Sequence, residues 1–135
     1  MPILFTQSLY DGWSHLFILG IECSQLGSLS ECKEEEKEIL EEYYTNVTAV
    51  VKEISKAENV SMYAIACVCH EMTGFRWLND DFEVPMQSGN HPENVASRWV
   101  NNEKVTLIDE VAWPDNKPCA FKAVKRRPSH NLISE

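Results

Sequence analysis

The feature that most constrains the fold is a long segment, Ser28 to Glu58, that contains neither proline nor glycine. Ser28 and Glu31 fit a capping box at its start, and Lys52 and Lys56 suit the negative end of a helix dipole. Within it, apolar side chains recur at spacings of three and four, which is the period of one helix face. These side chains are Leu40, Tyr43, Val47, Val50 and Ile54. The segment therefore predicts one long amphipathic helix over about 29–58.

Three other segments predict shorter helices. Residues 9–21 show a helical period after a capping box formed by Ser8 and Asp11. Residues 62–72 are apolar on all sides, which predicts a buried central helix, with a β-strand as the alternative. Pro92 suits the first position of a helix that runs to about residue 100 and places Trp99 on its inner face.

The end of the chain reads as a β-hairpin. Apolar residues alternate over 105–113, residues 114–118 are typical of a turn, and apolar residues alternate again over 119–123. Trp113 is predicted to be buried in the core, as Trp99 is. Helices that precede strands in this way predict an α+β class, in which N-terminal helices pack on a small C-terminal antiparallel sheet. We expect a single domain over 1–128 and a flexible tail over 129–135.

Charge and cysteine content narrow the functional classes. The chain has 135 residues, with 21 acidic against 12 basic side chains and a formal net charge of −9. This balance disfavours a nucleic-acid partner. The N-terminus lacks a basic start, and no apolar run reaches membrane length, so we expect a cytoplasmic protein without a membrane partner. In that compartment the five cysteines are expected to be reduced.

The residues offer two alternative chemistries. On a helix, Cys67, His70 and Glu71 would share one face, which suggests a metal-binding or Cys/His-dependent enzyme domain. However, the zincin motif that His70-Glu71 begins would need a histidine where Gly74 stands. A helix-turn-helix DNA-binding regulator can also be drawn over 61–79. The chain has no P-loop and no Gly-x-Ser-x-Gly elbow, so no catalytic residues and no cofactor are predicted.

A run of glutamates is the least ordinary feature. Because the apolar stripe begins only near Ile39, the preceding turns of the long helix are expected to stand clear of the core. The absence of a convincing catalytic set favours a small non-enzymatic interaction protein, of the inhibitor, immunity, anti-defence or adaptor type. It would dock a basic protein partner through the acidic side chains of this helix. The predicted partner-binding residues are Glu34, Glu35, Glu38, Glu41 and Glu42.

Overall fold

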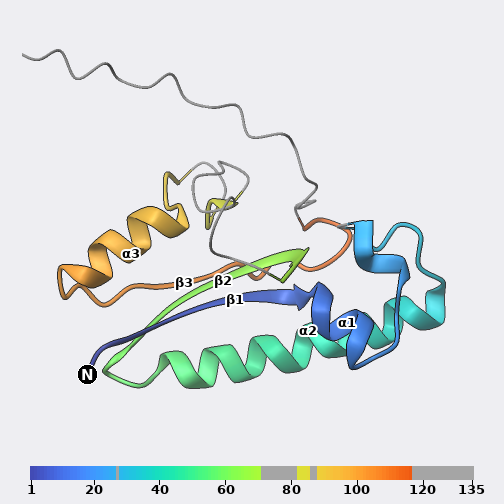
Figure 1. The fold of residues 1–135 in the computed structure, drawn as a ribbon, viewed down its shortest axis with the longest axis horizontal. Helices are drawn as coiled ribbons and strands as arrows, with labels where there is room; N and C mark the ends of the chain where they lie inside the picture. Colours follow the sequence, from blue (N-terminus) through green and yellow to red (C-terminus); the bar gives the residue numbers. More distant parts are fainter. Residues whose placement is uncertain (27, 71–81, 86–87, 117–135) are drawn as a thin grey trace, which may run out of the picture.

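A computed structural model describes residues 1–26, 28–70, 82–85 and 88–116. It is a three-layer arrangement in which helices lie on both sides of a short sheet (Figure 1). The elements follow one another as β1 (Ile3–Asp11), α1 (Gly12–Phe17), the 3₁₀ helix η1 (Cys23–Leu26), α2 (Glu34–Ser55), β2 (Val60–Cys69), α3 (Pro92–Val100) and β3 (Thr106–Ile108).

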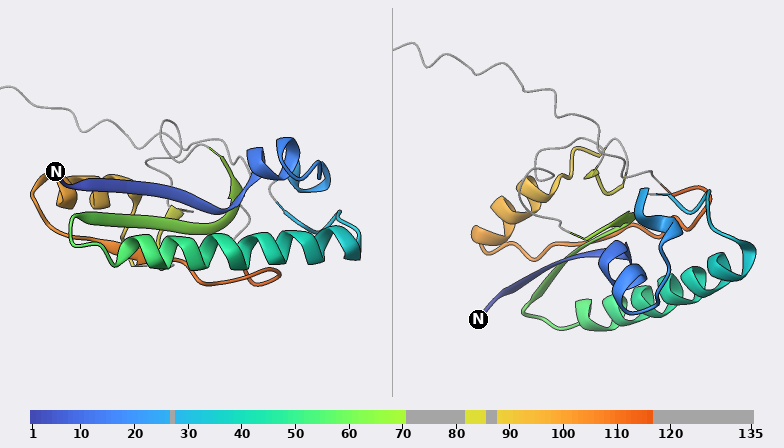
Figure 2. Two further views of the ribbon diagram at one scale, coloured as in Figure 1. Left: turned by 90° about the horizontal axis from the view of Figure 1, so that it is seen from below. Right: turned by 45° about the vertical axis from the view of Figure 1, so that its right-hand side comes forward.

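The sheet has the strand order β1-β2-β3, and both strand pairs are parallel. Parallel neighbours need long crossover connections, and helices provide them here. The segment with α1, η1 and α2 joins β1 to β2, and the segment with α3 joins β2 to β3. Helix α2 runs along the strands on one face, and α3 lies on the other (Figures 1 and 2). Strands β1 and β2 end side by side at one edge of the sheet, where α1 begins.

The central strand β2 is buried along its whole length. Its alternate residues belong to two different hydrophobic clusters. Met62 and Ala64 pack toward α2, whereas Tyr63 and Ile65 pack toward α3 and Val105. A parallel strand covered on both faces has a nearly continuous apolar sequence. The prediction of a buried helix over 62–72 is therefore wrong, and the β-strand alternative describes Val60–Cys69.

The predicted α+β class is also wrong. The described strands form a parallel sheet that begins at the N-terminus, and no antiparallel pair occurs among them. Residues 3–11 form a strand although Ser8 and Asp11 match a helix capping box, because β2 offers pairing partners along almost the whole strand. Strand β3 pairs with β2. Residues 119–123, which were predicted to form the second strand of a hairpin, lie outside the described residues together with the predicted tail.

Helix α2 is shorter than the predicted helix over 29–58, but it occupies the centre of that range. The side chains of Leu40, Tyr44 and Val51 are buried against the sheet, whereas Val50 is 56% exposed. Helix α3 has the bounds expected from its proline start. The two tryptophans that were predicted as core anchors, Trp99 and Trp113, are both half-buried. No helix in the described part of the chain is long and apolar enough to cross a membrane.

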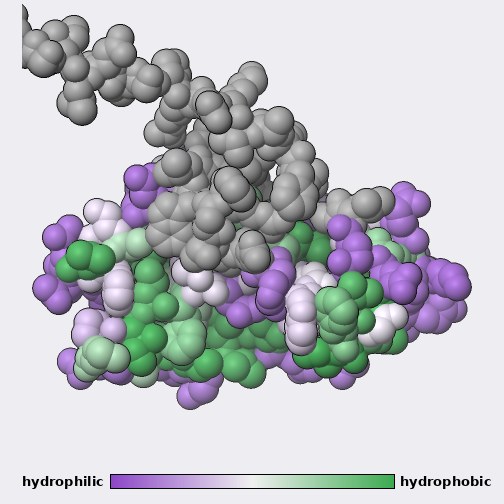
Figure 3. All heavy atoms as spheres, viewed as in Figure 1, coloured by the Kyte–Doolittle hydropathy of each residue, from purple (hydrophilic) through white to green (hydrophobic). Residues whose placement is uncertain are grey.

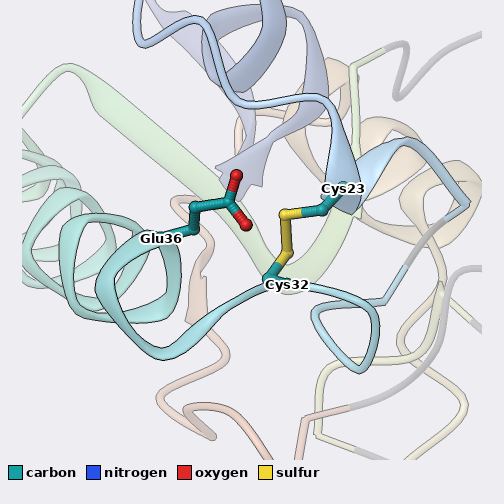
Figure 4. A group of neighbouring side chains, drawn as sticks. All are labelled: Cys23, Cys32 and Glu36. Atoms are coloured by element: carbon teal, nitrogen blue, oxygen red, sulfur yellow. A yellow bond between two sulfur atoms is a disulfide. The ribbon is translucent and has the colours of Figure 1, made fainter.

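Cysteine usage differs from the expectation of reduced thiols. Cys23 and Cys32 form a disulfide that ties η1 to the turn before α2 (Figure 4). Cys67 is disulfide-bonded as well, whereas Cys69 is a buried cysteine that is not part of a disulfide. Disulfides persist mainly in oxidising compartments and are rare in the cytosol. The expectation of reduced thiols is therefore wrong for three of the five cysteines.

Removing the Cys23–Cys32 disulfide should lower stability moderately. The two cysteines are nine residues apart in sequence, so the bond closes a short loop. For a loop of this size, the lost entropy of the unfolded chain corresponds to about 2–3 kcal/mol. We expect the double variant Cys23→Ser/Cys32→Ser to unfold at a lower urea concentration by that free energy. Cys69→Ser is the matched control, because it replaces a cysteine without removing a disulfide. Both variants and the wild type are also compared under reducing conditions that open the Cys23–Cys32 bond. A double variant as stable as the oxidised wild type would contradict the prediction.

Candidate active site

A histidine and a carboxylate meet where β1 and β2 end. His70 Nδ1 and Asp11 Oδ1 are 2.9 Å apart, although the two residues are 59 positions apart in sequence. Asp11 is the last residue of β1, and His70 directly follows the last residue of β2. The carboxylate is 14% exposed and the imidazole 54% exposed, so the pair opens to solvent on the histidine side. In parallel α/β sheets, ligands bind beyond these carboxyl ends of the strands.

The first turn of α1 holds the Asp11 carboxylate in place. Asp11 is the N-cap of this helix, and its Oδ1 accepts the backbone N–H groups of Trp13 at 2.9 Å and Ser14 at 3.4 Å. Because a carboxylate accepts this hydrogen bond, the Nδ1 atom of His70 donates it, and in the neutral form of the imidazole Nε2 is then the atom with a free lone pair. A histidine held in this tautomer by a buried acid is the arrangement found in catalytic triads.

A register shift aligns the two residues. Between Ser8 and Tyr10 the pairing of β1 with β2 slips by one residue, so that Asp11 pairs with Cys69. The Ser8 hydroxyl stabilises this irregularity by donating to the carbonyl of Cys67 at 2.5 Å and accepting from the backbone N–H of Tyr10 at 3.1 Å. β-Bulges often re-aim side chains beside active sites. Here the bulge places the acid next to the residue that precedes His70.

An aromatic side chain flanks the histidine. The Trp13 indole stacks on the His70 ring with centroids 5.9 Å apart and an interplanar angle of 28°. Phe17, one helical turn further along α1, lies 5.2 Å from the Trp13 ring. Trp13 is 47% exposed and Phe17 66% exposed. The acid–histidine pair therefore has an apolar surface at its side.

Of the alternative metal ligands Cys67, His70 and Glu71, only the first two lie in the described residues. Cys67 is disulfide-bonded and so has no thiolate to donate, and Glu71 lies outside the described residues. His70 instead uses its Nδ1 atom toward Asp11. The one group of three potential ligands in the described ranges is Cys23, Cys32 and Glu36. Figure 4 shows that its two sulfur atoms are bonded to each other, so they offer no thiolates either.

The predicted partner-binding glutamates lie at the start of α2, where hydrophilic residues gather on the surface (Figure 3). Four of the five are exposed. Glu41 is half-buried and accepts a hydrogen bond from the Tyr10 hydroxyl at 2.7 Å, which gives it a structural role. Glu34 forms a salt bridge with Lys37 at 2.7 Å. Docking of a basic partner by this run stays a prediction.

An apolar groove of about 460 Å³ lies elsewhere, between β1 and α2. Phe5 and Gln7 of β1 and the Val50 and Ile54 side chains of α2 are among its lining residues. The groove contains neither member of the acid–histidine pair.

The sequence interpretation considered His70 only as a metal ligand or thiol partner and Asp11 only as a helix cap. Both residues carry a signal that could have been recognised. Asp11 is the last residue of an apolar segment that can form a buried strand, and His70 directly follows another such segment. Polar residues at the carboxyl ends of neighbouring parallel strands meet at one edge of the sheet. The assignment of 62–72 as a helix concealed this relation, because it placed Cys67 and His70 on one face.

Comparison with known proteins agrees with an enzymatic site. The family model described as pectinacetylesterase matches residues 1–120. No curated protein and no solved structure matches the chain. The family match points to an esterase-type hydrolase, so the interpretation as an inhibitor or other non-enzymatic interaction protein is wrong. That interpretation relied on the lack of a contiguous catalytic motif, whereas Asp11 and His70 are brought together only by the fold. The chain belongs to the pectinacetylesterase family.

Proposed function

We propose that this chain supplies the acid and the general base of an acetylesterase active site. The observation that carries the proposal is the 2.9 Å contact between His70 Nδ1 and Asp11 Oδ1 at the carboxyl edge of a parallel sheet. The family match over residues 1–120 supports ester hydrolysis as the reaction. The acid precedes the histidine in the chain, which is also the order in α/β-hydrolases, where the nucleophile comes before both.

In the proposed reaction His70 Nε2 removes the proton from an attacking hydroxyl group as that oxygen bonds to the acetyl carbonyl carbon. The imidazolium then gives the proton to the alkoxide of the leaving alcohol as the ester bond breaks. Asp11 keeps the imidazole oriented and stabilises its positive charge during the transfer. The first turn of α1 fixes the carboxylate for this role through two backbone N–H groups.

No nucleophile is assigned among the described residues. The sequence contains no Gly-x-Ser-x-Gly elbow, and no described hydroxyl or thiol donates to the His70 ring. We infer that either a hydroxyl group outside the described residues or a water molecule attacks the ester. In both cases the chemistry of His70 and Asp11 is the same.

An activated acetyl ester tests the proposal without the missing nucleophile. Imidazole promotes hydrolysis of p-nitrophenyl acetate, so the wild-type chain should accelerate this reaction above buffer. We expect His70→Ala to lose the acceleration and Asp11→Asn to lower it about tenfold, because a positioned general base contributes at least that much. The matched control is His91→Gln, which alters a histidine 3.2 Å from Glu83 rather than from Asp11. A wild-type rate in His70→Ala would overturn the proposal.

A further inference from the structure

Strand β1 lies at one edge of the sheet. In the strand order β1-β2-β3 its described neighbour is β2, and the two strands pair in regular register from Ile3 to Ser8, before the register shift. Edge strands are commonly protected from pairing with another chain by charged side chains, a proline or a bulge. Residues 3–7 read Ile-Leu-Phe-Thr-Gln and contain none of these features. This stretch can therefore accept a further strand.

The backbone geometry shows which groups this edge offers. The N–H of Ile3 donates to the carbonyl of Asn59, the residue before β2, at 2.9 Å. Backbone groups of successive strand residues point to opposite sides of the strand, so the N–H and C=O groups of Leu4 and Thr6 point away from β2. No described strand lies on that side. An antiparallel strand centred on Phe5 can form hydrogen bonds with both Leu4 and Thr6.

The apolar groove between β1 and α2 continues from this edge. Phe5 is 42% exposed, and Val50 and Ile54 on α2 are 56% and 37% exposed. The helical period of the sequence includes Val50 and Ile54 in one apolar stripe, whereas the sheet covers the neighbouring line with Tyr44 and Val51. The described fold thus leaves part of the apolar stripe of α2 uncovered. Hydrophobic residues gather over β1 and α2 on the face drawn in Figure 3.

The groove is neutral although the chain is strongly acidic. None of its nine lining residues is Asp, Glu, Lys or Arg, while the net charge of the chain is −9. Phe5, Tyr43 and Met62 are among them, and aromatic residues and methionine are enriched in the cores of protein interfaces, where charged residues are depleted. The groove offers a basic partner no acidic side chain. Two acidic copies of the chain, by contrast, can meet at a neutral surface.

We propose that the open edge of β1 and the β1–α2 groove bind a second copy of this chain through an antiparallel β1–β1 pair. A two-fold axis through Phe5, perpendicular to the sheet, lets the same surface serve both copies. The two sheets then form one continuous sheet, and both α2 helices lie on the same face. The two Phe5 side chains lie opposite each other in a non-hydrogen-bonded pair, where cross-strand side chains are closest.

This surface is large enough for a specific dimer. Strand β1 has 9 residues and α2 has 22, so both are about 30 Å long, and together they are about 20 Å deep. About 600 Å² per copy, or about 1,200 Å² in total, reaches the lower end of the range for specific interfaces. The pairing also leaves the acid–histidine pair of each copy accessible, because Asp11 ends β1 about 20 Å from Phe5.

Sedimentation equilibrium of the full chain tests the dimer. We expect a wild-type dimer whose dissociation constant falls as salt is raised, because salt screens the repulsion between two acidic copies. Val50→Lys should raise the dissociation constant at least about tenfold, since it places a charge from each copy in an apolar interface. The matched control is Val100→Lys, which changes a 68% exposed valine of α3 outside the groove and should dimerise as the wild type does. A wild type that stays monomeric at roughly 100 μM would overturn the proposal.

Amide hydrogen exchange and a proline variant locate the pairing. The N–H groups of Leu4 and Thr6 should exchange slowly at high protein concentration and lose this protection on dilution, whereas protection of the Ile3 N–H should not depend on dimerisation. Thr6→Pro removes an N–H from the open edge and none from the ladder with β2, so it should abolish the dimer and leave the monomer folded. A dimer that Thr6→Pro leaves intact, or that protects neither amide, has its interface elsewhere and would contradict the proposal.

Discussion

Replacing Tyr10 by alanine should lower the free energy of unfolding by about 3–5 kcal/mol, the usual cost of removing a large buried aromatic side chain. Tyr10 is completely buried, and its ring stacks on Tyr44 with centroids 4.8 Å apart. Its hydroxyl donates to Glu41 of α2 at 2.7 Å and accepts from the backbone N–H of Trp113 at 3.0 Å. One side chain thus joins β1, α2 and the segment that follows β3.

Two tyrosine-to-phenylalanine variants separate the ring from the hydroxyl. Tyr10→Phe should cost about 1–3 kcal/mol, because it leaves the Trp113 N–H and the Glu41 carboxylate without their partner. The matched control is Tyr63→Phe, whose hydroxyl is buried and has no hydrogen-bond partner among the described residues. Burial raises the pKa of both tyrosines. We expect Tyr63→Phe to be neutral or stabilising in urea unfolding, and a similar loss in both variants would contradict this account.

Acidification from pH 7 to pH 4 should destabilise the protein by about 3 kcal/mol through His15 alone. The imidazole is completely buried, and burial lowers the pKa of His15 to about 4, against a lesser opposing effect of the Asp11 charge. Its Nδ1 atom is 2.9 Å from the hydroxyl of Ser24, and its ring packs edge-on against Tyr10 and Tyr43. The folded state therefore accommodates the neutral ring.

The pH window follows from the two pKa values of this histidine. Between about pH 6.5 and pH 4 the unfolded chain binds a proton at His15 and the folded chain does not, so stability falls as pH falls. Below about pH 4 both states are protonated and this contribution changes no further. Urea unfolding at pH 7 and pH 4 measures it by comparing the wild type with His15→Gln, which cannot titrate. An equal loss of stability in His15→Gln would contradict the assignment.

The sequence by itself determined the elements whose signals are local. The absence of proline and glycine between residues 28 and 58, together with a helical apolar period, specified the helix that is observed as α2. Pro92 marked the start of α3, because a proline at the first position of a helix sacrifices no hydrogen bond. These features depend on residues within a few positions of one another, and neighbouring elements cannot easily change them.

Only the tertiary structure decided the state of residues 62–69. An apolar run of this length fits a buried helix or a doubly covered strand equally well, and periodicity does not separate them. The flanking layers decide the outcome, since α2 covers one face and α3 with Val105 covers the other. The same ambiguity made residues 9–11 look like the start of a helix, although strand β1, Ile3–Asp11, pairs with β2 over almost its whole length.

The candidate site could not be predicted for the same reason. Asp11 and His70 are 59 residues apart, and their contact exists only because two parallel strands end side by side after a one-residue register shift. No spacing rule within one segment encodes that shift. The acidic run on α2 gave the stronger local signal, because clustered charge is visible in any sequence. The acid–histidine pair became visible only when the sheet placed its two halves 2.9 Å apart.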